Sequence, residues 1–560
     1  MAFSVFLPEH PSNERTMPPR IPLASYRHAG PSGPWPWADI VEESYETNLF
    51  LPGSNTEPKT QADDSSDSWR RYPTQLFPNW QSPRLLRSGM KKLIDKRKEK
   101  GDPDCVVYYI EIDKGGRFTK PGQYTVDEDS PTEFWETIKQ ERTRPNHVKV
   151  LFVENLSGTA LQMLGTMYKI EPFFFSSSLN WIPSRYQEGM QQNQGDHITI
   201  TLTFLRAMPN PMTAPNTPST GAQFFTQMLS RVGTATIDPQ APVVLRSNDR
   251  ILLLDLLAFH MVRDKNGSTI ISYHPTQEWK STSAIYLRTR VGHAGTSVYW
   301  QSLLQRSDDP TMILLCMLWY AMYAWDEALE NLYVHICWLE SRVLVANDIH
   351  LTRELHSIRA SLLHYASLLQ SFRKAVLFVR TTPNPAMQEH PDLEESAKIM
   401  DRECDTLISE IDRLEMFRGM QEMRIENMIN LAFASVNFED SRHTQALSEA
   451  SLRDGTAMKQ ISYMTMVFLP ASFVATLFGM NVTIVEDGAH ASMGQYLAVA
   501  VPLTAVTIWI MVGLRWQGES QETQKPFLYQ LKWPIHYSQK LAKRMVRRVK
   551  NKDSMNEGVV

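Results

Sequence analysis

The chain has 560 residues, of which 42% are hydrophobic, and its formal net charge is −4. A chain of this length can form several domains, and so small a net charge gives no indication of nucleic-acid binding. The four cysteines are far apart and form no C-x-x-C pair, so neither a disulfide framework nor a zinc site is predicted, and no cofactor is expected. The N-terminus has the pattern of neither a secretory nor a mitochondrial signal. Membrane insertion must therefore come from internal segments.

The N-terminal half of the chain predicts a tail followed by one domain. Residues 1–78 are rich in proline and small polar residues, which predicts a disordered tail. Residues 79–308 alternate β-rich runs with helical stretches such as 131–142, which predicts an α/β cytosolic domain with a proline-rich insertion near 208–221. The apolar runs of strand type are 105–113, 148–155, 197–205 and 250–262, and the last is long enough to be a helix instead.

Residues 309–458 have a helical pattern, with breaks near Asn347 and in 381–391. Near its end, six apolar residues keep one heptad phase, interrupted by Arg418 and Gln421, and they are Leu407, Ile411, Leu414, Ile425, Met428 and Ala432. Such a repeat predicts a coiled-coil seam.

Two uncharged runs lie near the C-terminus. Lys459 and Glu486 bracket 26 uncharged residues, and Asp487 and Arg515 bracket 27 more. A membrane-spanning helix needs roughly 20 apolar residues. We therefore favour two transmembrane helices within residues 459–514, at about 461–481 and 496–514, over a pair of buried core helices.

The basic residues around these runs predict the orientation of the two spans. Lys and Arg flank the pair, whereas the connection between the spans has neither, so the positive-inside rule places both termini in the cytosol. Glu486 and Asp487 then lie outside. The basic tail, residues 515–560, is interpreted equally well as a segment that contacts anionic lipid heads or as a solvated helix.

One face of the first span carries small and hydroxyl-bearing residues. The stripe recurs every three or four positions and comprises Ser462, Thr465, Leu469, Ser472, Thr476 and Gly479, of which Leu469 alone is large and apolar. In membranes such a stripe either packs against another helix or lines a water-filled pore. We favour the pore, because the stripe ends beside Asn481, whose amide carbonyl can accept hydrogen bonds from a hydrated cation.

Residues 458–481, MKQISYMTMVFLPASFVATLFGMN, resemble the first transmembrane segment of CorA-type magnesium channels. The shared landmarks are Met-Lys at the inner end, a Leu-Pro step in the middle and Gly-Met-Asn at the outer end. In its three clustered serines, 176–178, the chain resembles fungal CorA-like members. The resemblance implies a CorA-like funnel, a homopentamer whose subunits each have an α/β cytosolic domain, long stalk helices and two C-terminal transmembrane helices.

The resemblance also implies roles for particular residues. The first span would line a central pore with Met458, Ile461, Ser462, Thr465, Leu469, Ser472 and Thr476. Gly479, Met480 and Asn481 would form the outer selectivity filter, where Asn481 holds a hydrated cation, since Mg²⁺ gives up its water reluctantly. Cations would be concentrated by Glu486 and Asp487 at the outer mouth and by Glu439, Asp440, Glu449 and Asp454 at the inner mouth.

The transported ion is expected to be Mg²⁺, with Co²⁺, Ni²⁺ or Zn²⁺ as alternatives, across a plasma or vacuolar membrane. Residues 164–187 resemble the cytosolic segment of the family more thinly. Ser176 and Ser177 stand at two positions that are acidic in bacterial members, where carboxylates help to bind magnesium between subunits. Serine hydroxyls cannot replace that charge, which argues against magnesium sensing at this place.

The favoured function is therefore a pentameric divalent-cation channel in a lipid bilayer. The alternative is a CorA-shaped scaffold or sensor that conducts little, which Ser176, Ser177 and the weakly acidic outer loop suggest. Asn481 also begins an Asn-Val-Thr sequon, but because it adjoins an apolar run we favour the filter over glycosylation. An enzyme is not expected, since the sequence has neither a P-loop nor a nucleophile elbow.

Overall fold

The computed structural model describes two compact units, Met1–Ser435 and Val436–Val560. The described residues are 33, 68–96, 104–119, 121–127, 131–142, 148–191, 195–211, 237–265, 267–274, 282–343, 349–479, 493–515, 539 and 543. Most of the proline-rich insertion, the connection between the predicted spans and nearly all of the basic tail lie outside them.

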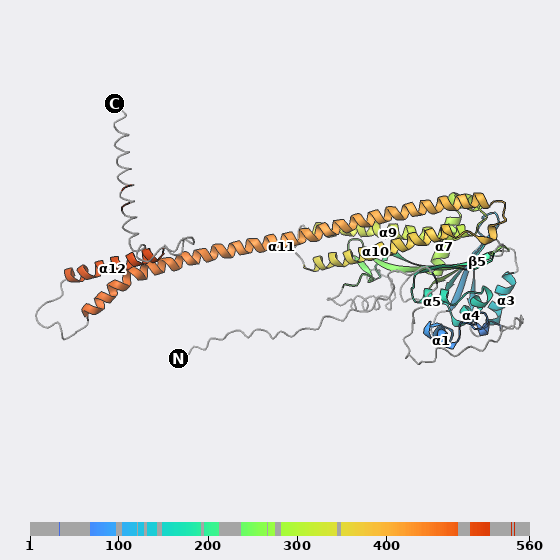
Figure 1. Ribbon diagram of the computed structural model, residues 1–560, viewed down its shortest axis with the longest axis horizontal. Coiled ribbons are helices and arrows are strands. Elements are labelled where there is room, and N and C mark those ends of the chain that lie inside the picture. The colour runs from blue at the N-terminus through green and yellow to red at the C-terminus, as the bar shows by residue number, and fades with distance from the viewer. Residues whose placement is uncertain are drawn as a thin grey trace, which may run out of the picture. The chain divides into compact units, whose positions relative to one another are not determined.

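The first unit is built around an eight-stranded sheet (Figure 1). The strand order is β2-β1-β3-β8-β7-β5-β4, with β6 paired to β7. Strands β3 and β8 are parallel, and the other pairs are antiparallel. The strands are β1 Cys105–Ile112, β2 Gly122–Val126, β3 Val148–Glu154, β4 Ser184–Gln191, β5 Gly195–Pro209, β6 Val243–Leu245, β7 Arg250–Asp264 and β8 Ser268–His274.

All four strands predicted from apolar runs are confirmed, and the ambiguous run 250–262 is strand β7. This strand is buried along nearly its whole length, because helices cover both faces of the sheet, and such a strand shows a continuous apolar run instead of alternation. The apolar runs did not predict the interior strand β8 or the short strand β6, nor did they predict β2 and β4, which are the two edge strands. Their mixed polar composition hides an edge strand from a search for apolar runs.

One helical layer contains short helices from the N-terminal part of the unit. Residue Phe174 of this layer packs its ring 5.3 Å from the ring of His260 on β7. The layer comprises η1 Ser68–Arg71, α1 Ser82–Arg87, α2 Met90–Ile94, α3 Pro131–Arg142, α4 Gly158–Met167 and α5 Phe173–Leu179.

The opposite face of the sheet is covered by longer helices. Arg263, which lies three residues after His260 and so on the other face of β7, donates a hydrogen bond to Thr311 at the start of α9, at 3.2 Å. The sheet thus lies between two helical layers. The second layer comprises α7 Ala284–Gly295, α8 Val298–Arg306, α9 Thr311–Val343 and α10 Ile349–Thr381, and after η2 Pro385–Met387 the helix α11 Leu393–Gly479 begins.

The predicted disordered tail extends to residue 78, but the structure describes the chain from Ser68 onwards. Trp69 and Tyr72 are buried there, and the Tyr72 hydroxyl donates to the carbonyl of Ile170 at 2.6 Å. Gly165 accommodates the tyrosine, since an added Cβ would lie 2.3 Å from its ring. Trp69 and Tyr72 therefore anchor the end of the predicted tail to the first unit, although the proline and polar content of this segment predicted disorder.

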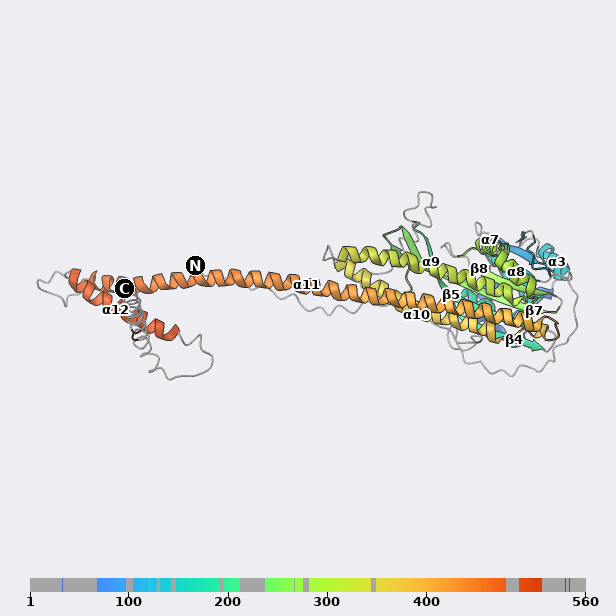
Figure 2. The same cartoon turned by 90° about the horizontal axis from the view of Figure 1, so that it is seen from above.

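The heptad seam of α11 packs within its own unit, where α9, α10 and α11 run side by side (Figure 1 and Figure 2). Its two polar interruptions are buried and bind backbone carbonyls. Arg418 donates to Leu362 of α10 at 3.2 Å, and Gln421 donates to Leu329 of α9 at 2.9 Å. The seam predicted as a coiled coil is thus a three-helix contact in this part of the chain.

Two of the described helices are long and apolar enough to cross a membrane, namely α9 and α11. The most apolar window of α9 is 72% buried, as expected for a core helix, whereas that of α11 is only 12% buried. The last helix, α12 Met493–Arg515, contains a shorter apolar segment from Tyr496 to Trp509. The predicted spans thus correspond to the end of α11 and to α12.

Candidate functional site

The predicted pore-lining residues lie in the second unit, on the last six turns of α11. Met458, Ile461, Ser462, Thr465, Leu469, Ser472, Thr476 and Gly479 are all exposed in the single chain. Gly479 is the last helical residue. Met480, Asn481, Glu486 and Asp487, which include two of the three predicted filter residues and both predicted mouth carboxylates, lie outside the described residues.

The face of α11 that meets α12 is nearly opposite to this stripe. Pro470 and Val474 are buried, and between them the carbonyl of Ala471 accepts a hydrogen bond from the Tyr496 hydroxyl of α12 at 3.2 Å. A helix turns by about 100° per residue, which places the stripe from Ser462 to Gly479 on the far side of α11. The hydroxyl-bearing side chains therefore face away from the second apolar helix of their own chain.

Three hydroxyls of the stripe donate hydrogen bonds to backbone carbonyls of α11 itself. Thr465 donates to the carbonyl of Ser462 and Ser472 to that of Leu469, each at 3.0 Å, and Thr476 donates to the carbonyl of Ser472. A hydroxyl that donates to its own helix keeps its oxygen lone pairs as acceptors. This face therefore presents acceptors, which suits the outward-pointing hydrogens of water around a cation.

The four acidic residues predicted at the inner mouth are exposed on α11, but they do not share one face. Asp440 and Asp454 have nearly the helical phase of the stripe, whereas Glu449 lies on the other side and accepts from Gln445 at 3.2 Å. Only the two aspartates therefore continue the stripe.

Ser176 and Ser177 lie on α5 inside the first unit. They stand at the positions where the absence of carboxylates argued against a cytosolic magnesium sensor. Their exposed fractions are 3% and 0%, and the Ser176 hydroxyl donates to the carbonyl of Phe173 at 3.3 Å. They do not reach a surface where a subunit contact could share an ion.

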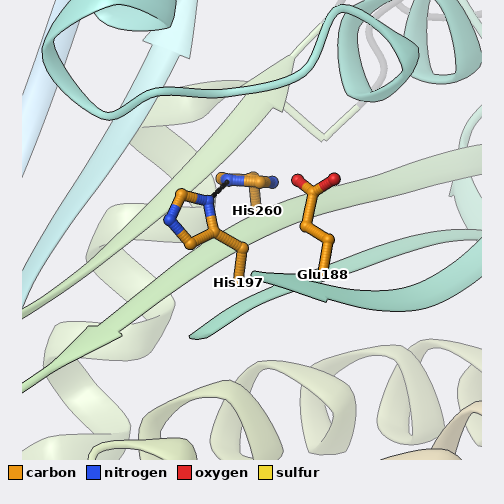
Figure 3. A group of neighbouring side chains, drawn as sticks. All are labelled: Glu188, His197 and His260. Carbon is orange, nitrogen blue, oxygen red and sulfur yellow. Dashed lines mark hydrogen bonds between the residues drawn. The ribbon is translucent and has the colours of Figure 1, made fainter. Parts of the chain in front are cut away.

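A group of three side chains that no sequence pattern predicted lies on the α5 face of the sheet, Glu188, His197 and His260 (Figure 3). Strands β4, β5 and β7 contribute one residue each, and Glu188 stands directly opposite His197 in the β4–β5 register. One ligand atom from each residue lies within 4.8 Å of the others. In the sequence, polar residues alternate with apolar ones at His197, Thr199, Thr201 and Thr203, which is typical of a strand with one solvent-exposed face. In the structure, that polar face is largely buried.

Burial determines the electrostatics of this group. Desolvation, reinforced by His197, lowers the pKa of the fully buried His260 well below its usual value. Burial, and then the nearby carboxyl of Glu171, raises the pKa of Glu188 to about 8. Within the described residues, Oε1 of Glu188 is buried without a hydrogen-bond partner. The group thus combines neutral imidazole nitrogen with crowded, poorly solvated carboxyl oxygen.

Residues 261–515 match the family model described as CorA-like Mg²⁺ transporter protein. The match begins within β7 and ends at the last residue of α12. It covers less than half of the chain, and the similarity to this family therefore applies to this segment alone. No curated protein matches the chain.

Solved structures resemble the chain only distantly. The CorA magnesium transporter from Methanocaldococcus jannaschii has 11% identity and a TM-score of 0.37, over 73% of this chain and 98% of its own. The full-length CmaX protein has 12% identity and a TM-score of 0.34, over 75% and 100%. The cytoplasmic domain of ZntB from Vibrio parahaemolyticus has 8% identity and a TM-score of 0.31, over 60% and 99%. Likenesses this weak add nothing to the family match.

Proposed function

Starting from the CorA-like character of residues 261–515, we propose that the chain transports divalent cations, with Mg²⁺ as the principal ion. The transporter is a homopentamer with both termini in the cytosol, in the plasma or vacuolar membrane. The end of α11 lines a central pore, and Gly479, Met480 and Asn481 form its outer filter. The family match of residues 261–515 carries this proposal.

The arrangement of α11 supports the same function. The helix continues without interruption from the first unit into the apolar segment, ending at Gly479. Its acceptor-lined stripe faces away from α12, so that copies around an axis can bring five stripes together. A pore of this kind holds a hydrated ion through its water shell and does not need to remove that water.

The role of Asn481 is tested by the substitution Asn481→Ala. In magnesium-starved cells that lack their own transporters, expression of the unmodified chain should restore growth, and the alanine variant should not, because a methyl group offers no acceptor to the hydrated ion. Thr507→Val on α12 is the control and should restore growth. Equal uptake by the Asn481 variant and the unmodified chain would show that this residue is not part of the filter.

The second candidate function is a CorA-shaped scaffold or sensor with little conduction. The observation that favours it is the burial of Ser176 and Ser177, which removes the inter-subunit magnesium site that bacterial members have at this place. Ion flux distinguishes the two candidates, because a scaffold expressed at the same level would not restore growth at all.

A further inference from the structure

The distance between the imidazoles of His197 and His260 matches that of two ligands on one metal ion. Nδ1 of His197 and Nε2 of His260 are 3.2 Å apart. Zinc–nitrogen bonds of about 2.0–2.1 Å at a tetrahedral angle place two such nitrogens about 3.3 Å apart. The same distance also allows a hydrogen bond between Nδ1 of His197 and Nε2 of His260. A metal ion bound to both nitrogens would take the place of the shared proton, and His197 would then carry its proton on Nε2.

We propose that Glu188, His197 and His260 form a binding site for one divalent transition-metal ion of the Zn²⁺ type within the first unit. Two imidazoles and a carboxylate supply three ligands, and water completes the tetrahedron. Imidazole ligands favour zinc-like ions, whereas Mg²⁺ takes oxygen ligands and retains its water. The site therefore selects against the ion that the proposed pore carries.

Neighbouring residues hold the ligands in position. Nδ1 of His260 lies 2.9 Å from Oγ1 of Thr199, and a proton donated to this hydroxyl leaves Nε2 as the ligand atom. Glu171, which crowds Glu188, accepts a hydrogen bond from Nε1 of Trp80 at 3.2 Å. Such outer contacts orient metal ligands and raise their affinity.

The two neighbouring carboxyl groups at the site also favour a bound cation. Glu171 and Glu188 are half-buried neighbours, and Oε1 of Glu188 has no hydrogen-bond partner among the described residues. Two carboxylates this close repel each other when both are ionised, and a dication bound between them would offset that repulsion. Ligands on three neighbouring strands are also held rigidly, so that little ordering is needed on binding.

An ion can enter from the edge of the sheet. Strand β4 is an edge strand, and Glu188 and His197 are half-buried, whereas His260 is fully buried. Gly189, next to Glu188, is exposed. The three ligands thus extend from the half-buried Glu188 and His197 to the buried His260.

The test uses the full-length chain, purified without a histidine tag, stripped with a chelator and loaded with Zn²⁺ in the presence of millimolar Mg²⁺. After desalting, elemental analysis should find one zinc per chain. Glu188→Gln and His197→Gln should each weaken zinc binding on the order of 100-fold. Zinc retained equally by the doubly substituted chain, or no zinc retained by the folded unmodified chain, would overturn the proposal.

Two controls separate this site from other histidines. His335→Gln replaces a buried imidazole that pairs with Glu354 at 3.1 Å. His390→Ala removes the imidazole from the second group of potential metal ligands, which also contains Asp308 and Asp392. Both variants should retain one zinc. Should the site variants fail to fold, the visible absorption of Co²⁺ in the unmodified chain decides, because a tetrahedral site gives intense bands. Weak octahedral absorption contradicts the proposal.

A functional pore is not needed for this result. A chain that binds zinc but transports no ion would refute the proposed function alone, whereas a transporting chain without bound zinc would refute only the site.

Discussion

At the scale of single residues, the first unit contains several buried polar side chains that are held by specific partners. His274 is an example: it is fully buried, its Nδ1 lies 2.7 Å from the carbonyl of Thr282, and its Nε2 lies 2.9 Å from the hydroxyl of Ser272. Nδ1–H therefore donates to the carbonyl, and Nε2 accepts from the serine. Both contacts suit the neutral ring.

The stability of the chain should depend on pH through His274. Desolvation lowers the pKa of this imidazole to about 4 in the folded state, from about 6.5 when unfolded. The unfolded chain therefore binds more protons between these values, so this contribution to stability is complete above pH 6.5 and is lost as the pH falls toward 4. The difference amounts to roughly 3 kcal/mol.

The measurement is the thermal unfolding midpoint of the purified chain across this pH range. In His274→Gln, which keeps a polar side chain but cannot be protonated, the midpoint should fall less on acidification than in the unmodified chain. Parallel curves for the two proteins would show that His274 does not titrate in this way.

At the scale of secondary-structure elements, one buried ion pair joins the sheet to the long helices. Arg263 of β7 and Asp196 of β5 form a salt bridge whose two side chains are fully buried. Arg263 also donates to Oγ1 of Thr311 at 3.2 Å and to the carbonyl of Thr382 at 3.1 Å. It therefore links two strands to the start of α9 and to the residue after α10.

Arg263→Met should lower the free energy of unfolding by about 3–5 kcal/mol, because it leaves the Asp196 carboxylate buried without its partner. The matched control on the same strand is Arg250→Met, which breaks the more exposed pair with Glu327 and should cost less than about 1 kcal/mol. Chemical unfolding of both variants provides the comparison. Similar losses in the two variants would contradict this role for Arg263.

A second element-scale prediction concerns the stripe on α11. Thr476→Val keeps the shape of the side chain but removes its acceptor oxygen, and the loss of one hydrogen bond of about 0.5–1.5 kcal/mol should slow Mg²⁺ flux about two- to tenfold. Thr507→Val makes the same change on α12, where the hydroxyl donates to Thr504 at 2.8 Å, and should leave flux unchanged. Equal flux in both variants would place Thr476 away from the ion pathway.

Most long elements could be predicted from the sequence, because their apolar residues recur with a clear period. The break in 381–391 is confirmed, since α10 ends at Thr381 and η2 follows it. The predicted break near Asn347 lies outside the described residues. Arg418 and Gln421 were interpreted as interruptions of a seam, whereas they bind the carbonyls of neighbouring helices. Such partners are distant in sequence, and no local pattern reveals them.

At the scale of the whole molecule, the two candidate sites differ in how far the sequence predicts them. The stripe on α11 is local, so its spacing alone shows that its residues share a face. The group of Glu188, His197 and His260 depends on the pairing of β4 with β5 and of β5 with β7. A residue separation of 63 between the two histidines gives no hint of a metal site until the strands are paired.

For the assembled molecule, we propose that hydroxyl stripes from several copies of α11 surround a shared aqueous pathway. The most direct test is Mg²⁺ uptake into liposomes that contain the purified full-length chain, followed with a magnesium-sensitive dye under an inside-negative potential. If the stripes line a pore, uptake should be well above that of empty liposomes and strongly reduced in Asn481→Ala. Uptake no greater than that of empty liposomes, from a folded and inserted chain, would contradict this proposal.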